Sequence, residues 1–303
     1  HFIGIGGSAL PVKSLVTFFG GAYWNHLSLP TRQGSPRFWI LDSMDPDALK
    51  RHPILSNPLS TRTLFHLVSK SGVTLEIEVL RRHILGKMEA AWPSHWKKMF
   101  LVTTTPGNQN LLHHWAARNR LAILTLDQDI GGRFSTFSPV AYTAAALMNL
   151  NLHALSEGAG LALAQAPLAL KYAELLAEQI KAGKTIHGFF LYGDCLVDLG
   201  ELLLQLFAES LGKEGRGLTP IKFIGTRDQH SLLQLYLGGP KDKAVTILQM
   251  APKEDSEPGQ AFGAACQGVA RALKTRGVKV FHITIEGQNE KTYGFLIQFF
   301  HLT

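Results

Sequence analysis

The segment TLFHLVSKSGVTLEIEVLRRHIL, residues 63–85, decides the fold class of this chain. Residues 63–68 form a short apolar run of strand length, and residues 75–85 place apolar side chains at helical spacing. Residues 69–74, between them, are rich in Ser, Thr and Gly, which is typical of a tight connection. A strand, a polar loop and a helix in succession form the repeating unit of a parallel α/β sheet.

The same alternation extends in both directions along the chain. Further β-rich runs occur at residues 2–5, 38–41, 99–103, 122–126, 188–192, 222–224, 245–250 and 278–285. Helical patterns separate these runs, and a helix-rich connection covers residues 139–181. We therefore predict an α/β fold with two tandem domains, residues 1–155 and 156–303, each a parallel sheet flanked by helices.

Composition limits the classes of protein to which the chain can belong. Residues are 46% hydrophobic and 17% charged, and no apolar run reaches the roughly 18 residues of a membrane span. The two cysteines lie in apolar contexts, which favours a reducing cytoplasm over a disulfide framework. The net charge of +7 suits an anionic partner, and because the basic residues are scattered we expect a small phosphorylated ligand rather than nucleic acid.

Both ends of the chain interrupt a pattern. Residues 2–5 are typical of the last part of a strand, and residues 299–303 lie inside a helical pattern that has no stop signal. We expect the chain to be a piece of a longer polypeptide, with the C-terminal part of its second domain missing.

The first loop of interest, residues 4–9, follows a strand and contains Gly7 and Ser8. Glycines permit a tight turn and close approach of backbone N–H groups to an anion. The loop also fits the dinucleotide pattern G-x-G-x-x-G/A, so a nucleotide-dependent oxidoreductase is an alternative. Asp42, the one candidate for the ribose carboxylate, lies further along the chain than this pattern expects.

The second loop carries three hydroxyl groups and one lysine: Ser69, Lys70, Ser71 and Thr74. Hydroxyls, a cation and the N–H groups of a helix N-terminus are the donors that bind phosphate. The alternative is that Ser71 caps the following helix. Capping accounts for one hydroxyl but not for Lys70, so phosphate binding is favoured.

A third loop, residues 129–135, places Arg133 after two glycines. Flexible glycines can direct this arginine into a cleft, where it would stabilise a developing oxyanion. A surface arginine on a mobile loop is the alternative.

An apolar segment, residues 195–208, is followed by Glu209 and predicts a buried helix that ends with this carboxylate. The negative end of the helix macrodipole and apolar neighbours both favour a raised pKa for Glu209, as a general base requires. Asp198, Glu201, Gln205 and Glu209 share one helix face, which is either a solvated face or the wall of a cleft.

The last loop contains His230, which we expect in the first turn of a helix at residues 228–237. The positive end of that helix would lower the pKa of His230 and keep its imidazole neutral, able to accept a proton. No Cys/His cluster has zinc spacing, so we expect no metal.

Taken in order, five stretches of this chain resemble the glucose-6-phosphate isomerase family: GIGGSAL, SKSGVTLE, DIGGRFSTFSP, ESLGKEGRGLTP and GTRDQHSLLQLYLGGP. The resemblance covers nearly the whole chain. It implies two sugar-isomerase (SIS) domains in a homodimer that interconverts glucose 6-phosphate and fructose 6-phosphate in glycolysis and gluconeogenesis, without cofactor or metal. The family also carries a late lysine that assists ring opening, and this chain does not reach it.

The resemblance also implies a role for each site residue. Glu209 moves the proton between C1 and C2, Arg133 stabilises the enediolate, and His230, supplied by the neighbouring subunit, assists ring opening. The substrate is bound by Gly7, Ser8, Ser69, Lys70, Ser71, Thr74 and Gln205. A sugar-phosphate-binding SIS regulator that does not catalyse is the main alternative, although binding alone would not need Glu209, Arg133 and His230.

Overall fold

The computed structural model describes residues 1–52, 55, 62–251 and 256–303. The chain forms two compact units, the first made of residues 1–13 and 24–148 and the second of residues 14–23 and 149–303. The domain boundary expected after residue 155 falls inside helix α6 (Leu152–Ala164), and a short segment from the first half of the chain packs with the second unit. None of the described helices is long and apolar enough to cross a membrane.

The first unit contains a five-stranded parallel sheet in the order β2-β1-β3-β4-β5. Its strands are β1 (Phe2–Ile3), β2 (Ile40–Leu41), β3 (Phe65–Val68), β4 (Phe100–Thr104) and β5 (Ala122–Thr125). Each lies within a run that the sequence predicts as a strand, apart from one residue at the end of β4. The expected parallel α/β architecture of this unit is confirmed.

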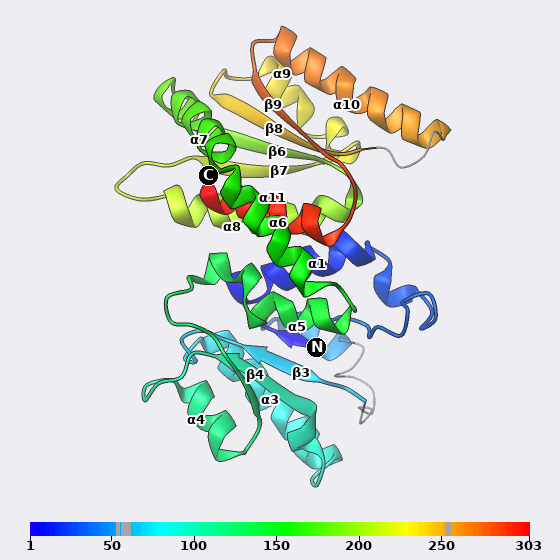
Figure 1. Ribbon diagram of the computed structural model, residues 1–303, viewed down its shortest axis with the longest axis vertical. Coiled ribbons are helices and arrows are strands. Elements are labelled where there is room, and N and C mark those ends of the chain that lie inside the picture. Colours follow the sequence, from blue (N-terminus) through cyan, green and yellow to red (C-terminus); the bar gives the residue numbers. More distant parts are fainter. Residues whose placement is uncertain (53–54, 56–61, 252–255) are drawn as a thin grey trace. The chain divides into compact units, whose positions relative to one another are not determined.

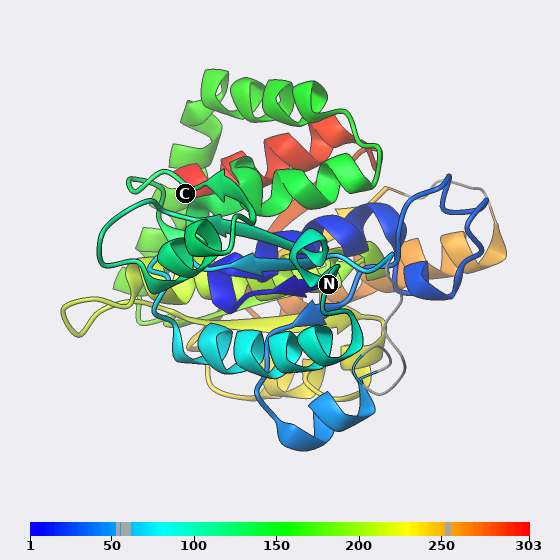
Figure 2. The same ribbon diagram turned by 90° about the horizontal axis from the view of Figure 1, so that it is seen from below.

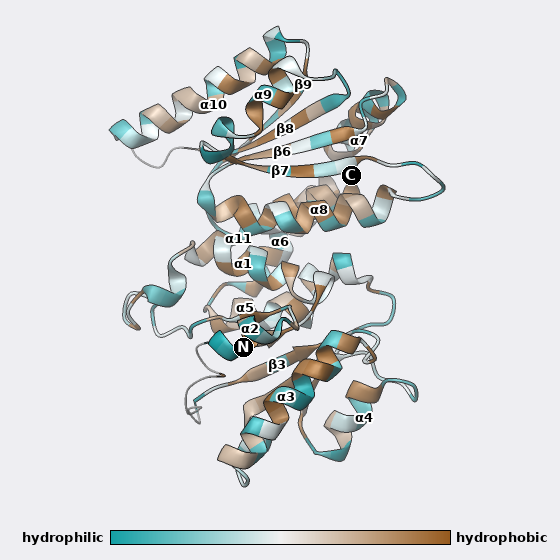
Figure 3. Cartoon of the chain, turned by 180° about the vertical axis from the view of Figure 1, so that it is seen from behind, coloured by the Kyte–Doolittle hydropathy of each residue, from teal (hydrophilic) through white to brown (hydrophobic). Residues whose placement is uncertain are grey.

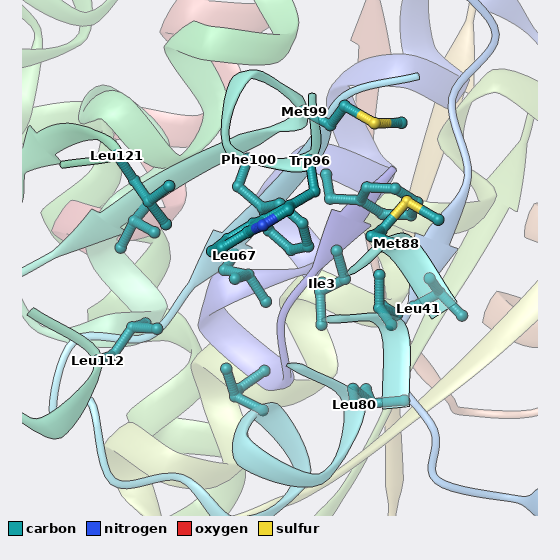
Figure 4. Packing of buried hydrophobic residues seen from close by; sticks show 14 of the residues in the cluster. Ile3, Leu41, Leu67, Leu80, Met88, Trp96, Met99, Phe100, Leu112 and Leu121 are labelled. Carbon is teal, nitrogen blue, oxygen red and sulfur yellow. The ribbon is translucent and has the colours of Figure 1, made fainter. Parts of the chain in front are cut away.

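Helices cover both faces of this sheet. Helices α3 and α4 lie on one face and α5 on the other (Figure 1). Buried side chains of α3, such as Leu80 and Met88, meet Leu67 and Phe100 of the strands in one apolar cluster (Figure 4). The helical segments of this unit are η1 (Gly6–Ser8), η2 (Trp24–His26), α2 (Pro46–Arg51), α3 (Leu75–Ala91), η3 (Trp96–Met99), α4 (Leu111–Arg118), η4 (Gly132–Phe137) and α5 (Pro139–Leu147). Helix α1 (Leu10–Gly20) begins in the first unit, and its residues from Ser14 onward belong to the second.

The second unit contains a four-stranded parallel sheet in the order β7-β6-β8-β9. The predicted strands of the second half are all present, as β6 (Ile186–Tyr192), β7 (Thr219–Gly225), β8 (Lys243–Met250) and β9 (Lys279–Ile285). The helical segments are α6, α7 (Ala166–Lys181), η5 (Asp194–Leu196), α8 (Val197–Leu211), η6 (Arg227–His230), α9 (Leu233–Gly238), α10 (Glu257–Thr275) and α11 (Glu290–Leu302).

Strand β6 shows why the strands of this sheet have continuously apolar sequences. Phe190 and Tyr192 pack in the cluster that includes α9 and α10, whereas Phe189 contacts Phe207 of α8 and Phe300 of α11. Both faces of the strand are therefore buried, as parallel sheets require. Figures 1 and 3 show α9 and α10 on one side of the sheet and α8 and α11 on the other. Helix α11, red in Figure 2, lies beside the green helices α6 and α7.

A histidine is buried in this core. His187 on β6 is 2% exposed, and its Nε2 lies 2.8 Å from Thr246 Oγ1, which in turn lies 2.6 Å from the Tyr172 hydroxyl. Burial lowers the pKa of His187 to about 3 because the apolar surroundings disfavour the charged imidazole. The folded protein therefore holds this imidazole neutral throughout the ordinary range of pH.

This burial predicts a loss of stability in mild acid. Since the unfolded histidine has a pKa of about 6.5, the unfolded chain binds one more proton between pH 6.5 and 3, and the free energy of unfolding falls as pH falls through that window. His187→Leu removes this proton. Its free energy of unfolding, measured with urea, should fall about 2 kcal/mol less between pH 7 and pH 5 than that of the parent protein.

The control is His95→Leu, at an exposed histidine of the first unit. This variant should retain the pH dependence of the parent. An equal fall in the parent and in His187→Leu would contradict the prediction.

Candidate functional site

The strand order of the first unit reverses between β1 and β3, and ligands of such sheets bind at the carboxyl ends of the strands beside that point. A pocket of about 820 Å³ lies there. It is lined by residues from the loops that follow β1, β3, β4 and β5: Ser8, Lys70, Ser71, Val73, Thr74, Thr105, Pro106, Gly107, Asn108, Gln109, Asn110 and Gly132. Of the predicted substrate-binding residues, this pocket brings together Ser8, Lys70, Ser71 and Thr74.

The hydroxyl groups of the loop after β3 converge. Thr74 Oγ1 lies 3.0 Å from Ser69 Oγ and 3.5 Å from Ser71 Oγ. Ser69 is buried and does not line the pocket itself, but its hydroxyl accepts a hydrogen bond from the Gly72 N–H at 3.1 Å. The three hydroxyls thus form one hydrogen-bonded group at the start of α3.

The N-terminus of α3 is not capped by a side chain. Thr74 occupies the capping position without making a side-chain hydrogen bond to the helix, and the hydroxyl of Ser71 accepts from the Val73 N–H at 3.4 Å instead. The alternative that Ser71 caps this helix is therefore wrong. Unsatisfied N–H groups and the positive end of the macrodipole make such a terminus attractive to an anion.

The charge of the pocket also suits an anion. Among the described residues that line it, Lys70 is the one with a charged side chain, and none is a carboxylate. A cation, two hydroxyls and a helix N-terminus facing one space can bind a phosphate group.

Gly7 brings two of the predicted loops together. Ser135 Oγ of η4 donates to the Gly7 carbonyl at 2.7 Å, and a Cβ atom at position 7 would lie only 2.3 Å from the backbone of Gly132. Glycine is therefore required by the close approach of the two loops, and Gly7 itself does not line the pocket. Arg133 follows Gly132 but does not line the pocket either; its guanidinium lies 4.9 Å from the centre of the Phe134 ring.

In the second unit, α8 has one buried face and one polar face. Leu199, Leu202, Leu203 and Leu206 are buried. On the polar face, Asp198 accepts a hydrogen bond from the Thr17 hydroxyl, Glu201 pairs with Lys222, and Gln205 Nε2 donates to Glu209 Oε2 at 3.1 Å.

Glu209 itself is exposed. The prediction that apolar side chains surround this carboxylate is wrong, because the apolar residues of α8 lie on the opposite face of the helix. The expected position of Glu209 in the last turn of a helix is confirmed, since α8 ends at Leu211.

His230 lies in the short 3₁₀ segment η6 and is exposed. The helix expected over residues 228–237 begins only at Leu233, so the prediction that His230 sits in the first turn of an α-helix is wrong. Side-chain bonds explain the difference: Asp228 Oδ2 accepts from the Ile224 N–H at 2.7 Å, and Gln229 Nε2 donates to the Tyr192 hydroxyl at 2.7 Å. These bonds hold the loop against the sheet.

Glu209 and His230 lie at opposite ends of β7. Helix α8 leaves the carboxyl end of β6 and returns to the start of β7, where Thr219 pairs with Ile186, whereas His230 follows the end of β7. A strand of this length spans about 20 Å, at 3.3 Å per residue. The second unit therefore does not bring the two predicted catalytic residues together.

Comparison with known proteins assigns the family. The chain is 31% identical over 322 residues to the glucose-6-phosphate isomerase of Rubrobacter xylanophilus, covering 98% of this chain and 73% of that protein. The chain belongs to the glucose-6-phosphate isomerase family. It is also 32% identical to a glucose-6-phosphate isomerase of Thermus thermophilus, across 96% of this chain and 68% of the relative.

The fold agrees with this assignment. A crystal structure described as a hypothetical protein from Thermus thermophilus matches 99% of this chain and 75% of its own, with a TM-score of 0.87 and 30% identity. No family model matches the chain. The assignment to the isomerase family thus rests on the similarity to these relatives, and the resemblance inferred from the five loops is confirmed.

The oxidoreductase alternative has no support from the structure of this isomerase-family chain. Asp42, its candidate ribose ligand, follows β2 and forms an ion pair with Lys13. The carboxylate is thus engaged by a lysine of α1, a helix that begins directly after the glycine-rich loop.

One loop of the pocket was not among the site residues predicted from the sequence. Residues 105–110 follow β4 and contribute half of the lining residues, including Asn110. The signal was present: Pro106-Gly107-Asn108 is a turn sequence directly after a predicted strand, and the loops after neighbouring parallel strands meet at one edge.

Proposed function

We propose that this chain catalyses the reversible isomerisation of glucose 6-phosphate to fructose 6-phosphate. The observation that carries the proposal is the pocket at the strand-order reversal of the first unit, in a chain that belongs to the glucose-6-phosphate isomerase family. Its donors, Lys70, Ser71, Thr74 and the uncapped N-terminus of α3, are those that a phosphate requires.

In this proposal the phosphate is held far from the reacting carbons. Lys70 and the hydroxyls of Ser71 and Thr74 bind the phosphate. The hydroxyl of Ser69 forms a hydrogen bond with that of Thr74 and fixes its position. The residues that contact the sugar are Gly7, Ser8 and Gln205. Binding energy from the phosphate then orients C1 and C2 for reaction.

The chemistry is a proton transfer between adjacent carbons. Glu209 removes the proton from C2 of the open-chain aldose and returns it to C1, while one proton moves between the two oxygens. Arg133 stabilises the negative charge of the enediolate that forms in between. The side-chain amide of Gln205, which donates to Glu209 Oε2 at 3.1 Å, can hold this carboxylate in one orientation.

We also propose that the active form is a homodimer in which His230 assists ring opening in the neighbouring subunit. The separation of Glu209 and His230 along β7 supports this arrangement. Both residues are exposed, so each can meet a substrate or a second subunit.

The first prediction concerns the base. Glu209→Gln keeps the size of the side chain but cannot accept the proton, so kcat should fall about a thousandfold, within the range of general-base catalysis. Binding of the sugar phosphate, measured by calorimetry, should change less than about twofold. Glu178→Gln, an exposed glutamate on α7, is the matched control and should retain full activity. Equal loss of binding and turnover would show that Glu209 is structural.

The second prediction concerns the phosphate. Lys70→Ala removes a charge that contacts ground state and transition state alike, so KM should rise about tenfold or more with a smaller change in kcat. Steady-state kinetics with glucose 6-phosphate measures both constants. Lys98→Ala, an exposed lysine of the same unit, should behave as the parent. An unchanged KM would remove Lys70 from the phosphate site.

The third prediction concerns the dimer. A mixed dimer of Glu209→Gln and His230→Ala subunits contains one site in which both residues are native, if each site takes them from different subunits. Mixing the two variants under conditions of subunit exchange should restore about one quarter of the parent activity. Activity that stays at the sum of the separate variants would exclude a shared site.

A further inference from the structure

The phosphate-binding loop, residues 69–74, is held by groups that do not belong to it. Thr104 Oγ1, at the end of β4, donates to the Ser69 carbonyl at 2.6 Å. The side-chain amide of Asn110 lies 3.1 Å from the Lys70 carbonyl, 2.8 Å from Thr104 Oγ1 and 2.7 Å from the Thr105 carbonyl. Two successive carbonyls of the loop are thus bound from the neighbouring strand and its loop.

Both the nitrogen and the oxygen of the Asn110 side-chain amide form hydrogen bonds. Its Nδ2 faces the three oxygens, and its Oδ1 accepts from the His113 N–H at 2.8 Å as the N-cap of α4. The residue is only 6% exposed. The Leu112 N–H adds a further link, because it donates to the Gly72 carbonyl at 3.2 Å.

Gly72 shows that the loop is shaped around this amide. Its backbone has φ of +67°, which favours glycine, and a Cβ atom at position 72 would lie 1.7 Å from Asn110 Oδ1. The loop and the Asn110 amide are therefore in direct contact at Gly72.

We infer that Asn110 is a positioning residue of the phosphate site, which acts with Thr104 by fixing the backbone that carries Lys70 and the hydroxyls. This inference rests on the proposed function. The amide supplies the donors that hold the loop in its binding shape before the ligand arrives, so that binding does not have to order it. Asn110 therefore determines affinity for the phosphate and not the proton transfer.

Asn110→Asp keeps the shape of the side chain, removes its hydrogen-bond donors and adds a negative charge to the pocket lining, so it is interpreted together with a neutral variant. Aspartate keeps the volume and the acceptor that caps α4, but it places a carboxylate oxygen against the Lys70 and Thr105 carbonyls, where donors are needed. The loop should be displaced. KM for glucose 6-phosphate should rise about tenfold with kcat within about threefold, and the Kd of inorganic phosphate should rise by a similar factor.

Thr104→Val is a second variant, in which valine has nearly the same size as the threonine that it replaces. Valine cannot donate to the Ser69 carbonyl or accept from Asn110, so KM and the phosphate Kd should rise together here as well, by a smaller factor. This variant decides the question if Asn110→Asp does not fold. Asn119→Ala is the control, because the side chain of Asn119 donates to the Trp115 carbonyl at the other end of α4, away from the phosphate-binding loop.

The experiment measures kcat, KM and, by calorimetry, the Kd of inorganic phosphate for the parent and the three variants. Parallel rises in KM and Kd in Asn110→Asp and Thr104→Val, absent from Asn119→Ala, support the inference. If the parent isomerises and binds phosphate but these two variants match Asn119→Ala, or lose kcat alone, the inference is overturned and the proposed function stands. A parent that neither isomerises nor binds phosphate would overturn both.

Discussion

A parallel sheet must be covered by helices on both faces, and this requirement determines where the polar loops of the chain can lie. Every strand of each sheet runs in the same direction, so the loops that leave the strands collect at one edge and the returning helices end at the other. Buried aromatic residues on both faces, such as Phe189 and Phe190 of β6, hold this arrangement in place. Binding groups can then occupy the loops without disturbing the core.

In the first unit this constraint concentrates recognition. The loops after β1, β3 and β4 meet where the strand order reverses, and they supply a lysine, hydroxyls and a helix N-terminus to one pocket. The loop that carries these donors is held by a second set of polar contacts, from Asn110 and Thr104 to its backbone carbonyls. The phosphate-binding loop therefore depends on a second loop, residues 105–110, which by its sequence alone does not resemble a phosphate site.

In the second unit the same constraint separates residues that act on one substrate in the proposed reaction. Glu209 closes a returning helix and His230 follows a strand, so the two lie at opposite ends of β7. The homodimer that we propose would resolve this separation, since one subunit would supply the carboxylate and the other the imidazole.

The sequence by itself determined the order of strands and helices, because the spacing of apolar residues is a local property that follows from the geometry of each element. It also determined the family, because glycines and polar residues in the loops retain recognisable patterns. Only the tertiary structure decided the details that depend on partners distant in the chain. The bonds of Asp228 and Gln229 shorten the helix expected at His230, α8 turns Glu209 outward, and Ser71 bonds within its own loop rather than capping α3. The local sequence can indicate a turn and a helix cap at Asn110 but not its contacts with the phosphate-binding loop, because these depend on the fold that brings it beside Gly72 and Lys70.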